Sequence, residues 1–216
     1  LEFRPWVHEC TAGVLRWKGR LDWIIDQLTL KKKASGAIRK ALLLAAYQLL
    51  EQPQVPRAWV VSETVDLVRS KEGDLAAKFI NAILRKISDH VESWRALSWP
   101  ESDDSRELAK WASLPDWIWN RIVRDYGLSW AKDYAQASLS RPTFWIRSKN
   151  KILNGNSGPL SESWQLDSWS PIHELSEYQE GRLFVQDISS QQLIEDFCIE
   201  ATKLLGSFQE IGRAHV

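Results

Sequence analysis

The sequence of 216 residues has no methionine, only two cysteines and no long hydrophobic run. Cys10 and Cys198 provide neither a disulfide framework nor a paired metal-binding motif, and so few cysteines are typical of a reducing compartment. The longest apolar run, ALLLAAY at 41–47, is far too short to cross a bilayer, and the first residues show no signal-peptide pattern. From these absences we expect a cytoplasmic protein without a membrane partner.

The chain also lacks net charge, because its 28 basic residues balance its 28 acidic ones. A nucleic-acid partner therefore requires a local basic patch, since no overall positive field exists to attract one. Residue 1 is leucine, from which we expect a fragment, a processed chain or a trimmed sequence. Tryptophan, in contrast, is abundant with 13 residues, and lineage composition and core packing explain this excess better than a binding code.

No catalytic constellation is present. The four histidines (His8, His90, His173 and His215) are scattered and have no metal-ligand spacing, and the ten glycines form no phosphate-binding or dinucleotide-binding loop. Cys198 lies in an amphipathic segment without a neighbouring histidine, which favours a buried structural cysteine over a nucleophile. We therefore expect no catalytic, cofactor-binding or metal-binding residue in this chain.

Helical periodicity extends almost without interruption from Trp6 to about Leu139. The segment 36–52 is too apolar for a surface helix, which predicts that it lies at the centre of the core. The segment SLPD at 113–116 predicts a capping box that opens a helix ending at Gly127. The sequence thus predicts an all-helical domain over 1–140.

The pattern changes at Arg141. The segments TFWIR (143–147) and GRLFVQD (181–187) are typical of short strands, and the turn-rich NGNSGP (154–159) lies between them. We therefore expect a domain boundary near residue 140, followed by the start of an α/β region.

Two groups of basic side chains are candidates for contact with RNA. If the segments that carry the first group pack together, they form a positive face that could follow phosphates, although a solvated helix face explains charge alone better. The second group flanks the first strand, where Phe144 and Trp145 could stack on bases or could simply be core residues. The first group is Arg16, Lys18, Arg20, Arg39 and Lys40, and the second is Arg141, Arg147 and Lys149.

Read in order, several segments resemble one protein family. Four segments resemble successive helices of the NusB-like RNA-binding domain. They are GVLRWKGRLDWIIDQL (13–28), AAYQLL (45–50), VPRAWVVSETVDL (55–67) and KFINAILRK (78–86). The segment LPDWIWNRIVRDYG (114–127) resembles the next helix of the RsmB-type (Fmu/Sun) ribosomal RNA cytosine-C5 methyltransferases. The segments RPTFWIRSKN (141–150) and EGRLFVQDISSQ (180–191) resemble the lead-in to their methyltransferase domain.

The resemblance implies a parent enzyme that transfers a methyl group from S-adenosylmethionine to C5 of a cytosine in small-subunit ribosomal RNA. In that family one cysteine adds to the base, a second promotes release, and a Cys-Ala-Ala-Pro-Gly-Gly-type loop binds the cofactor. This sequence stops before those motifs. S-adenosylmethionine is therefore implied only for the full-length parent, and we expect this chain to be a monomer that docks ribosomal RNA.

The chain departs from the family pattern in three places. Ser62 stands where the family usually has asparagine, and the stretch 149–180 predicts an abbreviated RRM-like subdomain. The final EIGRAHV (210–216) is compatible with a translated sequencing adapter. We therefore expect a NusB-like domain over 1–140, an incomplete methyltransferase lead-in over 141–205, and a truncation tail over 206–216 that is at least partly artefactual.

The sequence thus predicts a mainly α protein, with a NusB-like helical bundle followed by the start of an α/β region. Its predicted function is RNA docking for a methyltransferase domain that the chain lacks. One alternative is a stand-alone NusB-like module for transcription antitermination, which has no reason to carry EGRLFVQDISSQ. Another is a helical protein-interaction domain with a tryptophan-rich surface, which a large exposed aromatic patch would support.

Overall fold

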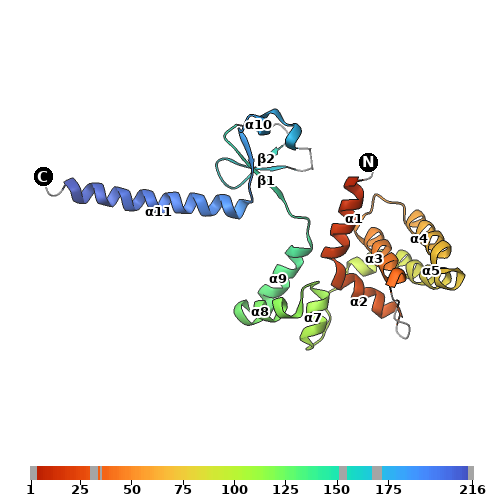
Figure 1. The fold of residues 1–216 in the computed structure, drawn as a ribbon. Coiled ribbons are helices and arrows are strands. Elements are labelled where there is room, and N and C mark those ends of the chain that lie inside the picture. Colours follow the sequence, from red (N-terminus) through yellow and green to blue (C-terminus); the bar gives the residue numbers. More distant parts are fainter. Residues whose placement is uncertain (1–3, 30–33, 35, 151–154, 167–171, 214–216) are drawn as a thin grey trace. The chain divides into compact units, whose positions relative to one another are not determined.

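The computed structural model describes residues 4–29, 34, 36–150, 155–166 and 172–213, with 204–213 described by their backbone alone. The chain divides into two compact units, unit 1 (residues 1–140) and unit 2 (residues 141–216) (Figure 1). Unit 1 is helical and unit 2 contains a small sheet. The predicted mainly α fold, a bundle followed by a sheet-containing region, is confirmed.

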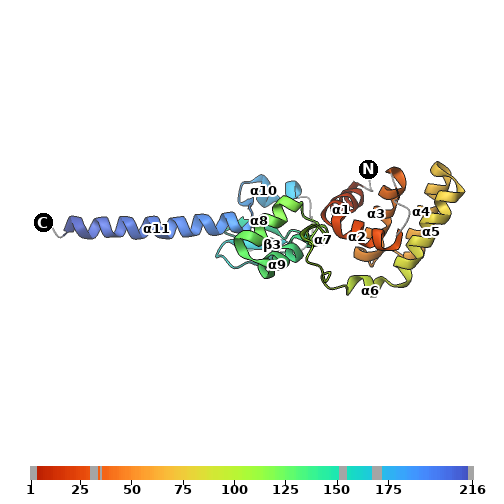
Figure 2. The same ribbon diagram turned by 90° about the horizontal axis from the view of Figure 1, so that it is seen from below.

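Helices α1, α2, α4, α5 and α6 of unit 1 pack around α3. Half of the 16 residues of α3 are buried, which confirms the predicted central helix. Figure 2 shows α6 and the following segment crossing from α5 towards α7. The bounds are α1 (Arg4–Arg16), α2 (Lys18–Thr29), α3 (Gly36–Glu51), α4 (Arg57–Glu72), α5 (Asp74–Asp89), α6 (Val91–Arg95), α7 (Ser105–Trp111), α8 (Asp116–Tyr126) and α9 (Leu128–Leu139).

Two glycines allow helices of unit 1 to approach closely. A Cβ on Gly13 of α1 would overlap the ring of Tyr47 on α3. A Cβ on Gly19 of α2 would overlap the carbonyl oxygen of Lys110 and lie 2.8 Å from Cα of Ser113. Glycine is therefore required where α1 crosses α3 and where α2 crosses α7.

The helices α7, α8 and α9 share a second, smaller core in unit 1. Its buried members include Trp119, on which Trp99 stacks with ring centroids 5.5 Å apart. The predicted capping box is wrong, because Pro115 precedes α8 without a side-chain cap. Ser113 instead has φ 56°, and its hydroxyl oxygen accepts a hydrogen bond from the backbone N–H of Arg20 at 2.9 Å. Gly127 ends α8 with φ 86°, as predicted.

Unit 2 contains a four-stranded antiparallel sheet with the order β2-β3-β1-β4. One face of this sheet carries Ile146, Leu166 and Leu183, which form the sheet core together with Ile172 and Leu175. The elements are β1 (Phe144–Ser148), β2 (Gly155–Ser157), β3 (Ser163–Leu166), η1 (Ile172–Glu174), α10 (Ser176–Gln179), β4 (Leu183–Val185) and α11 (Ile188–Arg213).

The helix α11 continues through position 206, where the sequence predicts the start of a tail. Cys198 is exposed on this helix, so the expectation of a buried cysteine is wrong there, whereas Cys10 is buried. Among the described residues, no helix is long and apolar enough to cross a membrane.

Candidate RNA-binding site

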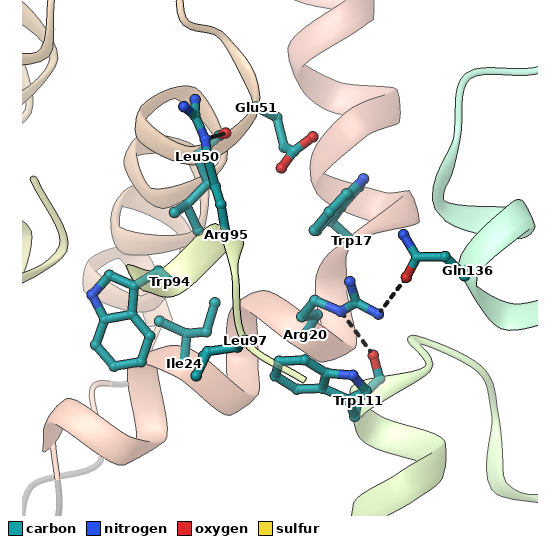
Figure 3. A pocket seen from close by; sticks show the side chains of 10 residues that line it. All are labelled: Trp17, Arg20, Ile24, Leu50, Glu51, Trp94, Arg95, Leu97, Trp111 and Gln136. Atoms are coloured by element: carbon teal, nitrogen blue, oxygen red, sulfur yellow. Dashed lines mark hydrogen bonds between the residues drawn. The ribbon is translucent and has the colours of Figure 1, made fainter. Parts of the chain in front are cut away.

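Arg20 does not lie on the exposed basic face that the sequence predicts. Its exposed fraction is 8%, and its guanidinium lies over the rings of Trp17 and Trp111, 5.1 and 4.6 Å from their centroids. Nε donates to the Trp111 carbonyl at 3.2 Å, and Nη2 donates to Oε1 of Gln136 at 3.4 Å (Figure 3). The surface prediction for Arg20 is therefore wrong, because burial against two tryptophans directs its charge into unit 1.

The Arg20 side chain borders a cavity of about 90 Å³ that we call the Arg20 cavity. Figure 3 shows its lining residues around a hollow, with the carboxylate of Glu51 directed inward. Burial raises the pKa of Glu51 although Arg95 and Arg20 oppose this shift, and burial lowers the pKa of Arg20 to about 10 against the attraction of Glu51. The lining residues are Trp17, Arg20, Ile24, Leu50, Glu51, Trp94, Arg95, Leu97, Trp111 and Gln136.

Arg39 belongs to an ion-pair network that joins α2, α3 and α7. Its Nη2 lies 2.5 Å from Oδ1 of Asp22 and its Nη1 lies 2.7 Å from Oδ1 of Asp26. Lys18 pairs with the other oxygen of Asp22 at 2.7 Å, and Lys110 pairs with the other oxygen of Asp26. Burial alone would raise the pKa of Asp26, but hydrogen bonds from Lys110 and Arg39 lower it below its usual value.

Because of this ion-pair network, only some members of the first basic group are exposed to solvent. The Arg39 side chain is only 19% exposed, whereas that of Lys18 is 58% exposed and Lys40 is exposed as well. Arg16 is half-buried, and within the described part of the chain neither Arg16 nor Lys40 forms a salt bridge. Arg16, Lys18 and Lys40 are therefore the members of the first group that could reach a phosphate.

The second group surrounds β1. Arg141 and Lys149 are exposed before and after the strand, and Arg147 forms a 2.9 Å ion pair with Glu162. Side chains alternate along β1, so Arg147 and Trp145 lie on the face opposite the sheet core. Phe144 packs against the sheet core, which leaves Trp145 as the better candidate for stacking on a base.

Sequence reasoning missed Phe184 on β4. It is 58% exposed and pairs in register with Arg147, so the two share the sheet face opposite the core. An alternating pattern with buried Leu183 was readable, but the pairing of β4 with β1 joins residues far apart in sequence. The sheet therefore presents an arginine between two aromatic residues, Trp145 and Phe184, which is an arrangement suited to unpaired bases.

The Arg20 cavity does not fit S-adenosylmethionine. The sequence has no glycine-rich cofactor loop, and the Arg20 cavity is much smaller than the roughly 300–1,000 Å³ typical of pockets for ligands of drug size. Among the described residues, no group of histidine, cysteine and acidic side chains could hold a metal ion.

In a comparison with known protein families, residues 2–89 match the NusB family. The ribosomal RNA small subunit methyltransferase B of Photorhabdus laumondii is 26% identical over 208 residues, which cover 89% of this chain and 47% of that protein. The proteins of the same name from Escherichia coli O1:K1 and Citrobacter koseri are 25% and 28% identical over 203 residues, with 86% of this chain and 45% of each covered.

Among solved structures, the crystal structure of PH0851 matches 86% of this chain and 45% of its own chain, with 14% identity and a TM-score of 0.47. The chain spans about half the length of the curated relatives it matches. Residues 2–89 thus match the NusB family, and the chain is similar over most of its length to bacterial ribosomal RNA small subunit methyltransferases B.

Proposed function

We propose that this chain is the RNA-docking part of an S-adenosylmethionine-dependent ribosomal RNA cytosine-C5 methyltransferase. The observation that carries the proposal is the extent of the homology, because the matched relatives cover 86–89% of the chain and thus extend well beyond the NusB domain at residues 2–89. The proposed partner is small-subunit ribosomal RNA, bound by a monomer in the cytoplasm. Methyl transfer and the cofactor belong to the full-length parent.

Two described surfaces support RNA docking. In unit 1, Lys18 and Lys40 are exposed near the N-termini of α2 and α3, with half-buried Arg16 at the end of α1. In unit 2, Arg147 shares a sheet face with two aromatic side chains, and exposed Arg141 and Lys149 flank its strand. Lysine and arginine contacts with phosphates supply affinity, and aromatic rings stack on unpaired bases.

The homology also bears on the alternatives. A stand-alone antitermination module needs only the NusB domain, so the matched segments after it favour the methyltransferase parent. A protein-interaction role has one supporting observation, an exposed ladder in which Trp130 stacks between Tyr126 and Tyr134 with centroids 4.5 and 5.4 Å apart. The ladder makes protein binding the second candidate function.

Binding of the 216-residue chain to a transcript of small-subunit ribosomal RNA tests the proposal. Fluorescence anisotropy with labelled transcript should show saturable binding that weakens as salt increases, because phosphate contacts release counterions. Absence of binding at low salt would contradict RNA docking. Replacement of Trp130 by alanine separates the second candidate, since it should leave RNA affinity unchanged if the ladder serves a protein partner.

A further inference from the structure

Two charged side chains, Arg20 and Glu51, line the Arg20 cavity, and each has a polar group that could still form a hydrogen bond. Among the described residues, Arg20 uses Nε and Nη2 for hydrogen bonds, whereas none is formed by its Nη1 or by the carboxylate of Glu51. Every fully buried polar side-chain atom in the described part of the chain has a partner. The unpartnered Nη1 and carboxylate therefore remain accessible, and both residues line the cavity.

The remaining walls of the cavity combine aromatic and aliphatic side chains with the polar side chains of Arg95 and Gln136. Trp17, Trp94 and Trp111 border it from three segments, with the Arg20 guanidinium over the rings of Trp17 and Trp111, and Ile24 and Leu97 lie below Glu51 in Figure 3. A single water needs roughly 10–15 Å³ by a comparable measure, so about 90 Å³ is more room than one bridging water requires. The space suits one planar ring system that contacts tryptophan and offers both a donor and an acceptor at its edge.

We propose that the Arg20 cavity holds one unpaired nucleobase, whose exocyclic amino group donates to Glu51 and whose carbonyl or ring nitrogen accepts from Arg20. This inference rests on the proposed RNA-docking function. Unpaired bases are generally recognised by stacking on aromatic side chains together with hydrogen bonds to their edges. Adenine, cytosine and guanine carry the amino group, whereas uracil does not, so the cavity discriminates against uracil.

The carboxylate of Glu51 disfavours a phosphate inside the cavity. Glu51 and Arg20 are of opposite sign, so a neutral base leaves their combined charge balanced. A phosphate inside the cavity would face the Glu51 carboxylate, which repels it. Arg95 also lines the cavity and attracts the Glu51 carboxylate, while its Nε donates to the Leu50 carbonyl at 2.6 Å and its Nη1 pairs with Glu92 at 3.3 Å. The sugar and phosphate of a bound nucleotide therefore remain outside.

Titration calorimetry with cytidine and uridine monophosphates tests this site on the 216-residue chain. We expect cytidine monophosphate to bind and uridine monophosphate to bind at least several-fold more weakly. Glu51→Gln retains the shape of the side chain but replaces one acceptor oxygen by a donor, so cytidine affinity should fall about tenfold, as loss of a hydrogen bond to a charged group predicts. The matched control is Glu63→Gln on the exposed surface of α4, which should leave affinity unchanged.

A second variant tests the proposal independently if Glu51→Gln changes the stability of the protein. Leu97→Phe adds volume at the cavity wall without removing a charged group, and it should also abolish binding of cytidine monophosphate. The proposal is overturned if neither nucleotide binds to the wild-type chain, or if Glu51→Gln and Leu97→Phe bind cytidine monophosphate as the wild type does. The first of these outcomes would show that the cavity contains a solvated ion pair and no ligand.

Binding of ribosomal RNA, measured on the same proteins, separates this inference from the proposed function. If wild type and Glu51→Gln bind the transcript equally and neither binds cytidine monophosphate, the cavity is not a base site although RNA docking stands. If the wild type binds no RNA at all, the proposed function fails. Reduced RNA affinity in Glu51→Gln, with Glu63→Gln unchanged, supports both.

Discussion

The guanidinium of Arg20 lies 4.6 Å from the ring centroid of Trp111 and donates through Nε to the carbonyl oxygen of the same residue. The two residues are 91 positions apart, so this contact ties α2, within the segment that matches the NusB family, to α7, which lies outside residues 2–89. Trp17 adds a second such tie, because its indole N–H donates to the Leu139 carbonyl at 3.0 Å. Unit 1 is thus held together across its two cores.

Arg20→Ala should lower the free energy of unfolding by about 2–4 kcal/mol, since it removes charge-assisted hydrogen bonds and cation–π contacts and leaves a buried carbonyl unpaired. Urea denaturation followed by circular dichroism measures this change. Arg85→Ala on the exposed side of α5 is the matched control, for which about 0.5 kcal/mol or less is expected. Equal effects of the two variants would show that the tie contributes little.

Gly19→Ala tests the close approach of α2 to α7 through the sign of its effect. Helix propensity alone makes alanine more stable than glycine by about 1 kcal/mol in a helix interior. The added Cβ, however, would overlap the backbone of Lys110, which cannot move as a flexible side chain does. We therefore expect a net loss of about 1–3 kcal/mol in a thermal or urea melt, as overpacking predicts. A more stable variant would contradict the observed packing.

Asp26→Asn should destabilise the protein at pH 7 and lose its effect in acid. Hydrogen bonds from Lys110 and Arg39 lower the pKa of Asp26 in the folded state, so its contribution exists above the unfolded pKa and disappears as pH falls through the folded one. The side chain is 41% exposed, so we expect about 1 kcal/mol or less. Unfolding curves at pH 7 and at about pH 3 check this difference.

Glu51→Gln should change the stability at pH 7 in the opposite direction to Asp26→Asn. Burial raises the pKa of Glu51 in the folded state despite the nearby Arg95 and Arg20, so the folded protein binds the proton more tightly than the unfolded chain does. Its ionisation therefore costs stability as pH rises through the folded pKa, and the variant should be more stable than wild type at pH 7. The gain should shrink below the ordinary carboxyl pKa of about 4.3. A gain that persists unchanged in acid would show that ionisation is not the cause.

Patterns within single elements predicted much of the fold. The apolar excess of 36–52 gave the central helix, and Gly127 gave the end of α8, because both effects depend on local backbone and burial. The prediction of a capping box at Ser113 was wrong because the serine hydroxyl accepts a hydrogen bond from the distant backbone N–H of Arg20 instead. Local motifs were therefore reliable only where no distant residue competed for the same group.

The candidate site was less predictable, because a run of basic residues does not state which helix face each one occupies. Arg20 precedes Ile24 by four positions on the buried stripe of α2, and this spacing was a signal for burial that the charge cluster obscured. Glu51 and Trp94 gave no such signal, since only the folded chain brings the ends of α3 and α6 to one cavity. Non-local packing decided these positions.

RNA docking is tested most directly by the salt dependence of ribosomal RNA affinity in a charge variant and a matched control. Lys18→Ala/Lys40→Ala removes two exposed cations of α2 and α3, whereas Lys71→Ala/Lys78→Ala removes two exposed cations of α4 and α5. If the first pair contacts phosphates, the slope of log affinity against log salt should become shallower by about 0.7–0.9 per lost contact, and the control should retain the wild-type slope. Identical slopes for wild type and both variants would contradict the assignment of this face to RNA.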